Sequence, residues 1–172
     1  YSMALKRLQS EYKQLLTEPN YFYSVEPDPK NFFTWTVLLI GPPDSPFEGG
    51  IFKICFVLPN DYPYNPPKMN FVTKVYHPNI SRDGGICIDI LKDQWSAAMR
   101  LNTIFLSLSS LLANPNPNDP LVPEIANEYN ELLNTDSFKV EKTNDEDVFR
   151  ITGLVSEDDL SRFNIKDEFI II

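Results

Sequence analysis

Four strand-like segments follow one another closely in the first half of the chain, and they constrain its fold more than any other feature. Each contains β-branched and aromatic residues and directly follows a proline, glycine or asparagine. The gaps between them are too short for the helical crossovers that parallel strands need. Their order therefore predicts a four-stranded antiparallel meander. The segments are residues 21–25, 32–40, 51–58 and 68–73.

Apolar residues recur at helical spacing on both sides of these segments. One helix is predicted from Leu5 to Leu16, and another over residues 101–112. A third begins at Pro123, because proline suits the first position of a helix. An N-terminal helix, an antiparallel meander, a long irregular stretch and C-terminal helices together predict an α+β domain.

Charge and hydropathy limit the partners of the chain. Among its 172 residues, 15 are Lys or Arg and 24 are Asp or Glu, a net charge of −9. This negative net charge argues against sequence-independent binding to nucleic acid and against binding to anionic lipid. No apolar run approaches the roughly 20 residues that cross a bilayer. We therefore expect a soluble protein of the cytoplasm or the nucleus, with neither nucleic acid nor membrane as a partner.

The chain changes character near residue 130. Residues 131–172 contain 5 basic and 11 acidic residues, and no proline lies beyond Pro123. We therefore separate a core, residues 3–134, from a divergent acidic segment, residues 135–172. This segment contains four phenylalanines and a capped helix pattern at residues 156–163. We expect it to fold back over apolar surface of the core, with partner binding as the alternative.

Residues 74–100 form an irregular stretch that is long for a connection without a function of its own. Within it, the turn Arg82-Asp-Gly-Gly85 leads directly to Cys87. A cysteine on such a loop, with the carboxylate of Asp89 two residues later, is a candidate nucleophile. Its isoleucine neighbours are equally typical of a packed thiol.

The other cysteine and the single histidine suggest structural roles. Cys55 lies in the apolar run 51–58 and is predicted to be a small buried residue of the core. His77 could act as a general base for Cys87, but a role in bracing the loop through backbone hydrogen bonds is favoured. Two cysteines and one histidine provide neither a disulfide framework nor a zinc site, so no metal or cofactor is expected.

Seven segments in order resemble the ubiquitin-conjugating enzymes. His-Pro-Asn alone would be weak evidence, but the cysteine ten residues after the histidine and the other segments make the resemblance specific. It covers residues 3–133 and implies the ubiquitin-conjugating fold for the core. The segments are Met3-Ala-Leu-Lys-Arg-Leu8, Gly41-Pro-Pro-Asp-Ser-Pro46, Asp61-Tyr-Pro-Tyr-Asn-Pro-Pro-Lys68, His77-Pro-Asn79, Gly85-Ile-Cys-Ile-Asp-Ile-Leu91, Gln94-Trp-Ser96, and Asn114 to Ala126.

The resemblance implies an acyltransferase. Cys87 would accept ubiquitin as a thioester from the activating enzyme and pass it, with a ligase, to a substrate lysine. Asn79 would support the oxyanion or hold the active-site loop, and both roles stay open. Asp119 would position and deprotonate the incoming lysine, with Asp89 as a second candidate for that role. His77 and Asp89 are otherwise assigned to support of the loop.

The resemblance also implies a surface that docks RING or U-box ligases. Ala97 stands where close relatives have proline, and Tyr64 stands where a phenylalanine is usual. The peptide bond between Tyr62 and Pro63 matches a position where the family usually has a cis bond. The implied ligase-binding residues are Lys6, Arg7, Pro63, Tyr64, Ser96, Ala97 and Ala98.

Ser24 and Arg100 also lie at positions that can be matched to the family. Ser24 matches a strand serine at which some relatives bind ubiquitin non-covalently, although a solvated serine is equally compatible. Arg100 precedes the central helix where a capping threonine is common, which predicts a poorly capped helix start.

Implied partners are ubiquitin, the activating enzyme, ligases and substrate proteins. The alternatives are a conjugating enzyme for another ubiquitin-like modifier and a catalytically silent ubiquitin-binding variant, which typically lacks the cysteine.

Overall fold

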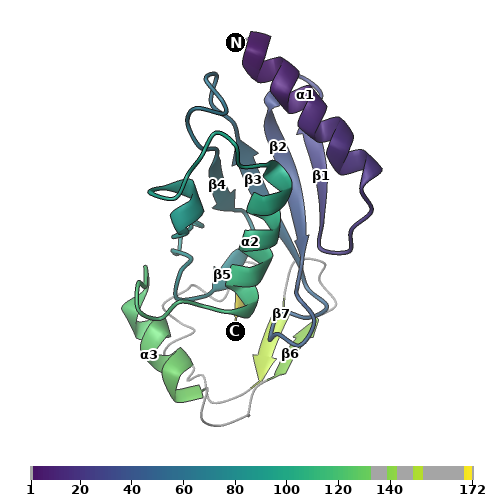
Figure 1. The fold of residues 1–172 in the computed structure, drawn as a ribbon. Helices are drawn as coiled ribbons and strands as arrows, with labels where there is room; N and C mark the ends of the chain where they lie inside the picture. The colour runs from purple at the N-terminus through teal and green to yellow at the C-terminus, as the bar shows by residue number, and fades with distance from the viewer. Residues whose placement is uncertain (1, 133–138, 143–148, 153–168, 172) are drawn as a thin grey trace.

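The computed structural model describes residues 2–132, 139–142, 149–152 and 169–171 (Figure 1). Its order of helix, meander, loop and helices is the predicted α+β arrangement. The elements are α1 (Ser2–Thr17), β1 (Tyr23–Asp28), β2 (Asn31–Ile40), β3 (Ile51–Val57), β4 (Lys68–Phe71), β5 (Lys74–Tyr76), the 3-10 helix η1 (Asp89–Leu91), α2 (Leu101–Ala113), α3 (Pro123–Leu132), β6 (Lys139–Lys142), β7 (Phe149–Thr152) and β8 (Phe169–Ile171).

Strands β1 to β4 form one sheet in sequence order, and every neighbouring pair is antiparallel. A row of apolar partners crosses the sheet through Val25, Val37, Ile54 and Phe71. Helix α2 crosses in front of this face in Figure 1. The helix contributes buried apolar residues to the same core cluster: Leu101, Ile104, Phe105, Leu108 and Leu112. The predicted meander is therefore confirmed, and its inner face holds the core.

The outer face of the sheet corrects the interpretation of Cys55. Burial alternates along β3, so that Phe52, Ile54 and Phe56 are buried while Cys55 is only half-buried. The Cys55 Cα pairs with Thr36 and Asn70, which belong to the outward-facing set. The prediction of a core cysteine was wrong, because an apolar run in a strand does not show whether one face or both are covered.

The C-terminal segment is described only in three short strands. β6 and β7 pair antiparallel, and β8 pairs in parallel with β5, with Val75 opposite Ile170. The backbone of β8 thus lies against the core. Whether the phenylalanines of this segment cover apolar surface stays a prediction, and the helix expected at residues 156–163 lies outside the described residues. None of the helices described is long and apolar enough to cross a membrane.

Candidate active site

His77 anchors the start of the active-site loop from a fully buried position. Its Nδ1 accepts a hydrogen bond from the backbone N–H of Asn79 at 3.0 Å, so its Nε2 donates to the carbonyl of Leu111 in α2 at 2.9 Å. Burial lowers the pKa of His77 to about 4, against a smaller opposing effect of the bond to Leu111. Both ring nitrogens are occupied, and neither is free to take a proton from Cys87.

Asn79 ties the loop that carries Cys87 to the loop after α2. Its Nδ2 donates to the carbonyls of Asn116 at 2.8 Å and Asp119 at 3.1 Å, and its Oδ1 accepts from the backbone N–H of Asn116 at 2.7 Å. Its own backbone carbonyl accepts from the N–H of Cys87 at 3.0 Å. Because the side chain is buried and both amide hydrogens are used, this geometry fits loop holding better than direct contact with an oxyanion.

A tight turn delivers Cys87 to this place. Gly84 has φ +89°, and a Cβ there would lie 2.1 Å from the carbonyl oxygen of Phe71 in β4. The N–H of Phe71 in turn donates to the Gly84 carbonyl at 2.9 Å. Only glycine accepts both the positive φ and this close approach. The predicted Arg82–Gly85 turn is therefore confirmed, and it fastens the active-site loop to the sheet.

The Cys87 sulfur lies between two charged side chains. It is 3.5 Å from Oδ2 of Asp119, which follows α2, and 3.7 Å from Nζ of Lys92, which follows η1. Cys87 is half-buried, whereas Asp119 and Lys92 are exposed. The structure thus brings Cys87 and Asp119 together, as the sequence interpretation expected, and adds a lysine that it did not include.

Asp119 and Lys92 shift the pKa of the Cys87 thiol in opposite directions. The pKa of Cys87 is raised, first by burial and then by the hydrogen bond to Asp119, while Lys92 partly offsets the increase. Cys87 is therefore held as a thiol near neutral pH rather than as a stable thiolate. Such a group suits exchange with an acyl donor that is already activated, because that exchange needs little general-base assistance.

The fold and the environment of this cysteine can be compared with known protein families. The family model of the ubiquitin-conjugating enzymes matches residues 7–156, which is most of the chain. The chain belongs to this family. Ubiquitin-conjugating enzymes are transferases of ubiquitin conjugation, and they generally work with ubiquitin, an activating enzyme and ligases. Within the described residues, no group of three or more His, Cys, Asp or Glu side chains could hold a metal ion.

Three segments of this ubiquitin-conjugating enzyme meet at Arg7 on α1. The Arg7 guanidinium donates to the carbonyls of Ala97 and Met99, both at 3.3 Å, and lies over the Tyr62 ring at 5.8 Å. Lys6 beside it is exposed. The N-terminal helix and the loops around residues 61–64 and 96–99, which carry the seven predicted ligase-binding residues, therefore form one surface.

The two loops of this surface are joined by Trp95, whose Nε1 donates to the carbonyl of Pro63 at 3.1 Å. The Tyr62–Pro63 bond is cis, which confirms the expected geometry. Tyr64 stands where the family usually has phenylalanine. It is 73% exposed, so water can solvate its additional hydroxyl group. Ala97 and Ala98 are exposed, and the Ala98 N–H donates to Oγ of Ser96 at 3.2 Å.

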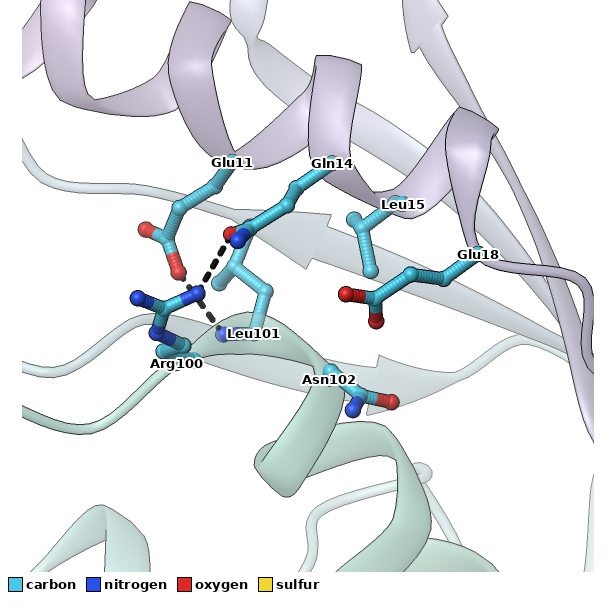
Figure 2. Close-up of a pocket in the computed structure, with 7 residues that line it drawn as sticks. All are labelled: Glu11, Gln14, Leu15, Glu18, Arg100, Leu101 and Asn102. Atoms are coloured by element: carbon cyan, nitrogen blue, oxygen red, sulfur yellow. Dashed lines mark hydrogen bonds between the residues drawn. The ribbon is translucent and has the colours of Figure 1, made fainter.

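Glu11 connects this surface to the start of α2, a role that the sequence analysis missed. Its buried carboxylate accepts from Tyr62 Oη at 2.6 Å, from Arg7 Nε at 3.1 Å and from the N–H of Leu101 at 2.9 Å. Arg100 makes no capping bond to the helix, as predicted, but its Nη1 donates to Oε1 of Gln14 at 2.6 Å. Figure 2 shows these side chains of α1 facing the start of α2, where Glu11 satisfies the Leu101 N–H from another helix.

The remaining predicted residues lie outside this cluster or act through the backbone. Asp89 is exposed at the start of η1, and its carbonyl accepts from the N–H groups of Lys92 and Gln94. Ser24 is exposed on the outer face of β1, where it pairs with Leu38 of β2. Lys92 could not have been singled out from the sequence, since its only signal is a position five residues after Cys87.

Proposed function

We propose that Cys87 accepts ubiquitin as a thioester from the activating enzyme and passes it, with a ligase, to a substrate lysine. The observation that carries this proposal is the position of the Cys87 sulfur, half-buried on a loop fastened to the sheet and 3.5 Å from Asp119. The incoming thioester is an activated acyl donor, so exchange between thiols needs no strong base beside the cysteine. This agrees with a histidine whose two nitrogens are already bonded.

Asp119 serves the second step in this proposal. A lysine amine must lose a proton before it can attack a thioester, since a free lysine at neutral pH is almost wholly protonated. The Asp119 carboxylate lies beside the sulfur and is exposed, so it is placed to orient an arriving ammonium group and accept its proton. Asn79 holds Asp119 in place through the backbone carbonyl of that residue.

Ligase binding is assigned to the surface around Arg7. A RING or U-box domain would contact the exposed side chains of Lys6 and Tyr64 together with the loop at Ala97. Alanine in place of the family's usual proline leaves that loop more freedom in the unbound state. The choice among ligases is therefore expected to depend on Tyr64 and Ala97.

The test is incubation with activating enzyme, ATP and ubiquitin, followed by gels run with and without reductant. We expect an adduct one ubiquitin heavier that disappears with reductant and is absent from Cys87→Ala. The matched control Cys55→Ala should form it normally, because Cys55 lies on the outer face of the sheet. A Cys87→Lys variant should instead hold ubiquitin through a reductant-resistant amide.

Three other results would contradict the proposal. A labile adduct that survives in Cys87→Ala would assign the carrier to another residue. Loading with a different ubiquitin-like modifier only would favour the first alternative function. Ubiquitin binding without any covalent adduct would favour the silent variant.

A further inference from the structure

Strand β8 is paired with the strand that leads into the active-site loop. It runs parallel to β5, with Val75 opposite Ile170 at the centre of the pair (Figure 1). Residues 169–171 are one phenylalanine and two isoleucines, residue types that favour strands. The hydrogen bonds between the two strands therefore join the divergent acidic segment to the core through main-chain atoms.

β5 depends strongly on this pairing. It lies outside the four-stranded sheet, and among the described strands β8 is its only strand partner. Val75 and Tyr76 are buried, so their backbone N–H and carbonyl groups need partners within the protein. A strand as short as β5 has few backbone groups with which to hold its position. Loss of β8 would therefore leave β5 without its hydrogen-bonded neighbour.

β5 connects a fixed point on the sheet to the cysteine loop. Just before it, the N–H of Lys53 in β3 donates to Oγ1 of Thr73 at 2.8 Å. Just after it, Nδ1 of His77 accepts from the N–H of Asn79 at 3.0 Å. The carbonyl of Asn79 then accepts from the N–H of Cys87 at 3.0 Å. A displacement of β5 would therefore reach Cys87 through these hydrogen bonds.

We propose that the edge of β5 is a docking site for an extended apolar segment, that β8 of the same chain fills it, and that this strand addition positions the active-site loop. In strand addition, main-chain hydrogen bonds provide affinity and alternate side chains provide specificity. The effect on Cys87 rests on the proposed function, whereas the docking of β8 on β5 does not. Because β8 acts on Cys87 only through the loop, its role is positioning.

The first experiment measures amide hydrogen exchange in the full chain and two variants. The double variant Ile170→Pro/Ile171→Pro removes two successive backbone donors from β8, and proline cannot donate to a strand ladder. The control Ile170→Val/Ile171→Val keeps both donors and both β-branched side chains. We expect exchange at Val75 and Tyr76 to become about tenfold faster in the proline variant only. The N–H of Cys87 should also exchange faster in that variant.

Exchange at Val37 distinguishes a local effect from a general loss of stability. Val37 lies within β2 and is paired with both β1 and β3, away from the β5–β8 pair. Its exchange rate should be the same in all three chains. Equal acceleration at Val37 and Val75 in the proline variant would overturn the local role of β8.

A peptide added in trans tests whether β5 is a docking site. The peptide Lys-Asp-Glu-Phe-Ile-Ile-Ile, which corresponds to residues 166–172, is added in excess to the proline variant. The control peptide has proline at the positions of Ile170 and Ile171. We expect the first peptide to restore slow exchange at β5 and the control peptide to have no effect. Equal effects of the two peptides would overturn docking by strand addition.

The second readout is the rate at which Cys87 is loaded with ubiquitin at saturating activating enzyme. The proline variant should load at least about threefold more slowly, because small displacements of reacting groups reduce rates strongly. The valine variant should load at the rate of the unaltered chain. The matching peptide should return the rate of the proline variant toward that value, and the control peptide should not.

The outcomes separate this inference from the proposed function. Unchanged exchange at β5 in the proline variant overturns the docking of β8. Faster exchange at β5 with an unchanged loading rate overturns the positioning of the loop. Absence of any labile adduct on the unaltered chain overturns the proposed function, while the exchange rates still decide whether β8 docks on β5.

Discussion

The Asp119 carboxylate lies 3.5 Å from the Cys87 sulfur, although 32 residues separate the two in the chain. One buried residue, Asn79, contacts both loops. Asn79 donates to the carbonyl of Asp119 at 3.1 Å, and its backbone carbonyl accepts from the N–H of Cys87 at 3.0 Å. The distance between the Cys87 thiol and the Asp119 carboxylate therefore depends on the hydrogen bonds of Asn79.

Replacing Asp119 should separate loading from discharge. Asp119→Ala should accept ubiquitin on Cys87 near normally but release it slowly to free lysine, because only the second step requires deprotonation of an amine. The defect should shrink as the pH rises from about 7 to 9, as more lysine loses its proton in solution. Single-turnover discharge assays across this range provide the measurement.

The control for this experiment is Glu26→Ala, which removes an exposed carboxylate from β1. It should leave both steps unchanged. An Asp119→Ala defect that is independent of pH would instead indicate a structural role at the turn before Pro120. Equal loss of loading and discharge would remove Asp119 from the catalytic residues.

The two charged neighbours of Cys87 should shift its titration in opposite directions. Asp119→Asn removes a carboxylate that raises the pKa of the thiol, so the midpoint of thiolate formation should move to lower pH. Lys92→Gln removes a cation that lowers this pKa, so the midpoint should move to higher pH. Rates of alkylation by iodoacetamide against pH measure both, in a Cys55→Ala background that leaves one thiol. Shifts in the same direction would contradict the contacts described.

His77 should make the fold sensitive to mild acid. Burial lowers its pKa to about 4 in the folded protein, from 6.5 when exposed. Between these values the unfolded chain binds more protons, so the free energy of unfolding falls as the pH decreases, by about 3 kcal/mol at most. His77→Gln should be less stable than the unaltered protein at pH 7, and the gap should narrow toward pH 4.5. Urea denaturation at several pH values would show this, and a constant gap would argue against it.

Glu11 should contribute more to stability than its exposed neighbours on the chain. Glu11→Ala leaves the buried hydroxyl of Tyr62 and the N–H of Leu101 without their acceptor. Loss of bonds to a charged group costs about 1.5–3 kcal/mol each, so a destabilisation of about 3 kcal/mol or more is expected. Glu18→Ala, at an exposed position just after α1, should change the free energy of unfolding by less than about 0.5 kcal/mol. Similar losses in both variants, measured by denaturant unfolding, would refute the assignment.

The order of secondary structure was predictable because it depends on local patterns. Periodicity in the sequence located α2 and all four strands of the meander to within a few residues, and the short gaps predicted antiparallel pairing. Proline at residue 123 correctly predicted the start of α3. The turn before Cys87 was equally predictable, since Gly84 accepts a positive φ that other residues rarely adopt.

Burial was less predictable, as Cys55 shows. Its apolar neighbours in β3 indicated a core position, yet the structure places it half-buried on the outer face of the sheet. Alternate side chains of a strand point to opposite faces of the sheet. The sequence of the strand alone does not show which of these faces a helix covers. The coverage depends on α2, which lies about fifty residues further along the chain.

By itself the sequence determined the elements, their order and the loop that carries Cys87, because each depends on residues close together in the chain. The tertiary structure decided what surrounds the sulfur and what caps α2. The family resemblance indicated Asp119, but nothing in the sequence indicated the contacts of Lys92 with the sulfur or of Glu11 with the start of α2. Contacts of this kind exist only after the sheet and helices have packed. The position of Cys87 on its loop was therefore predictable from a sequence motif. The effect of Asp119 and Lys92 on the pKa of its thiol is a property of the folded chain.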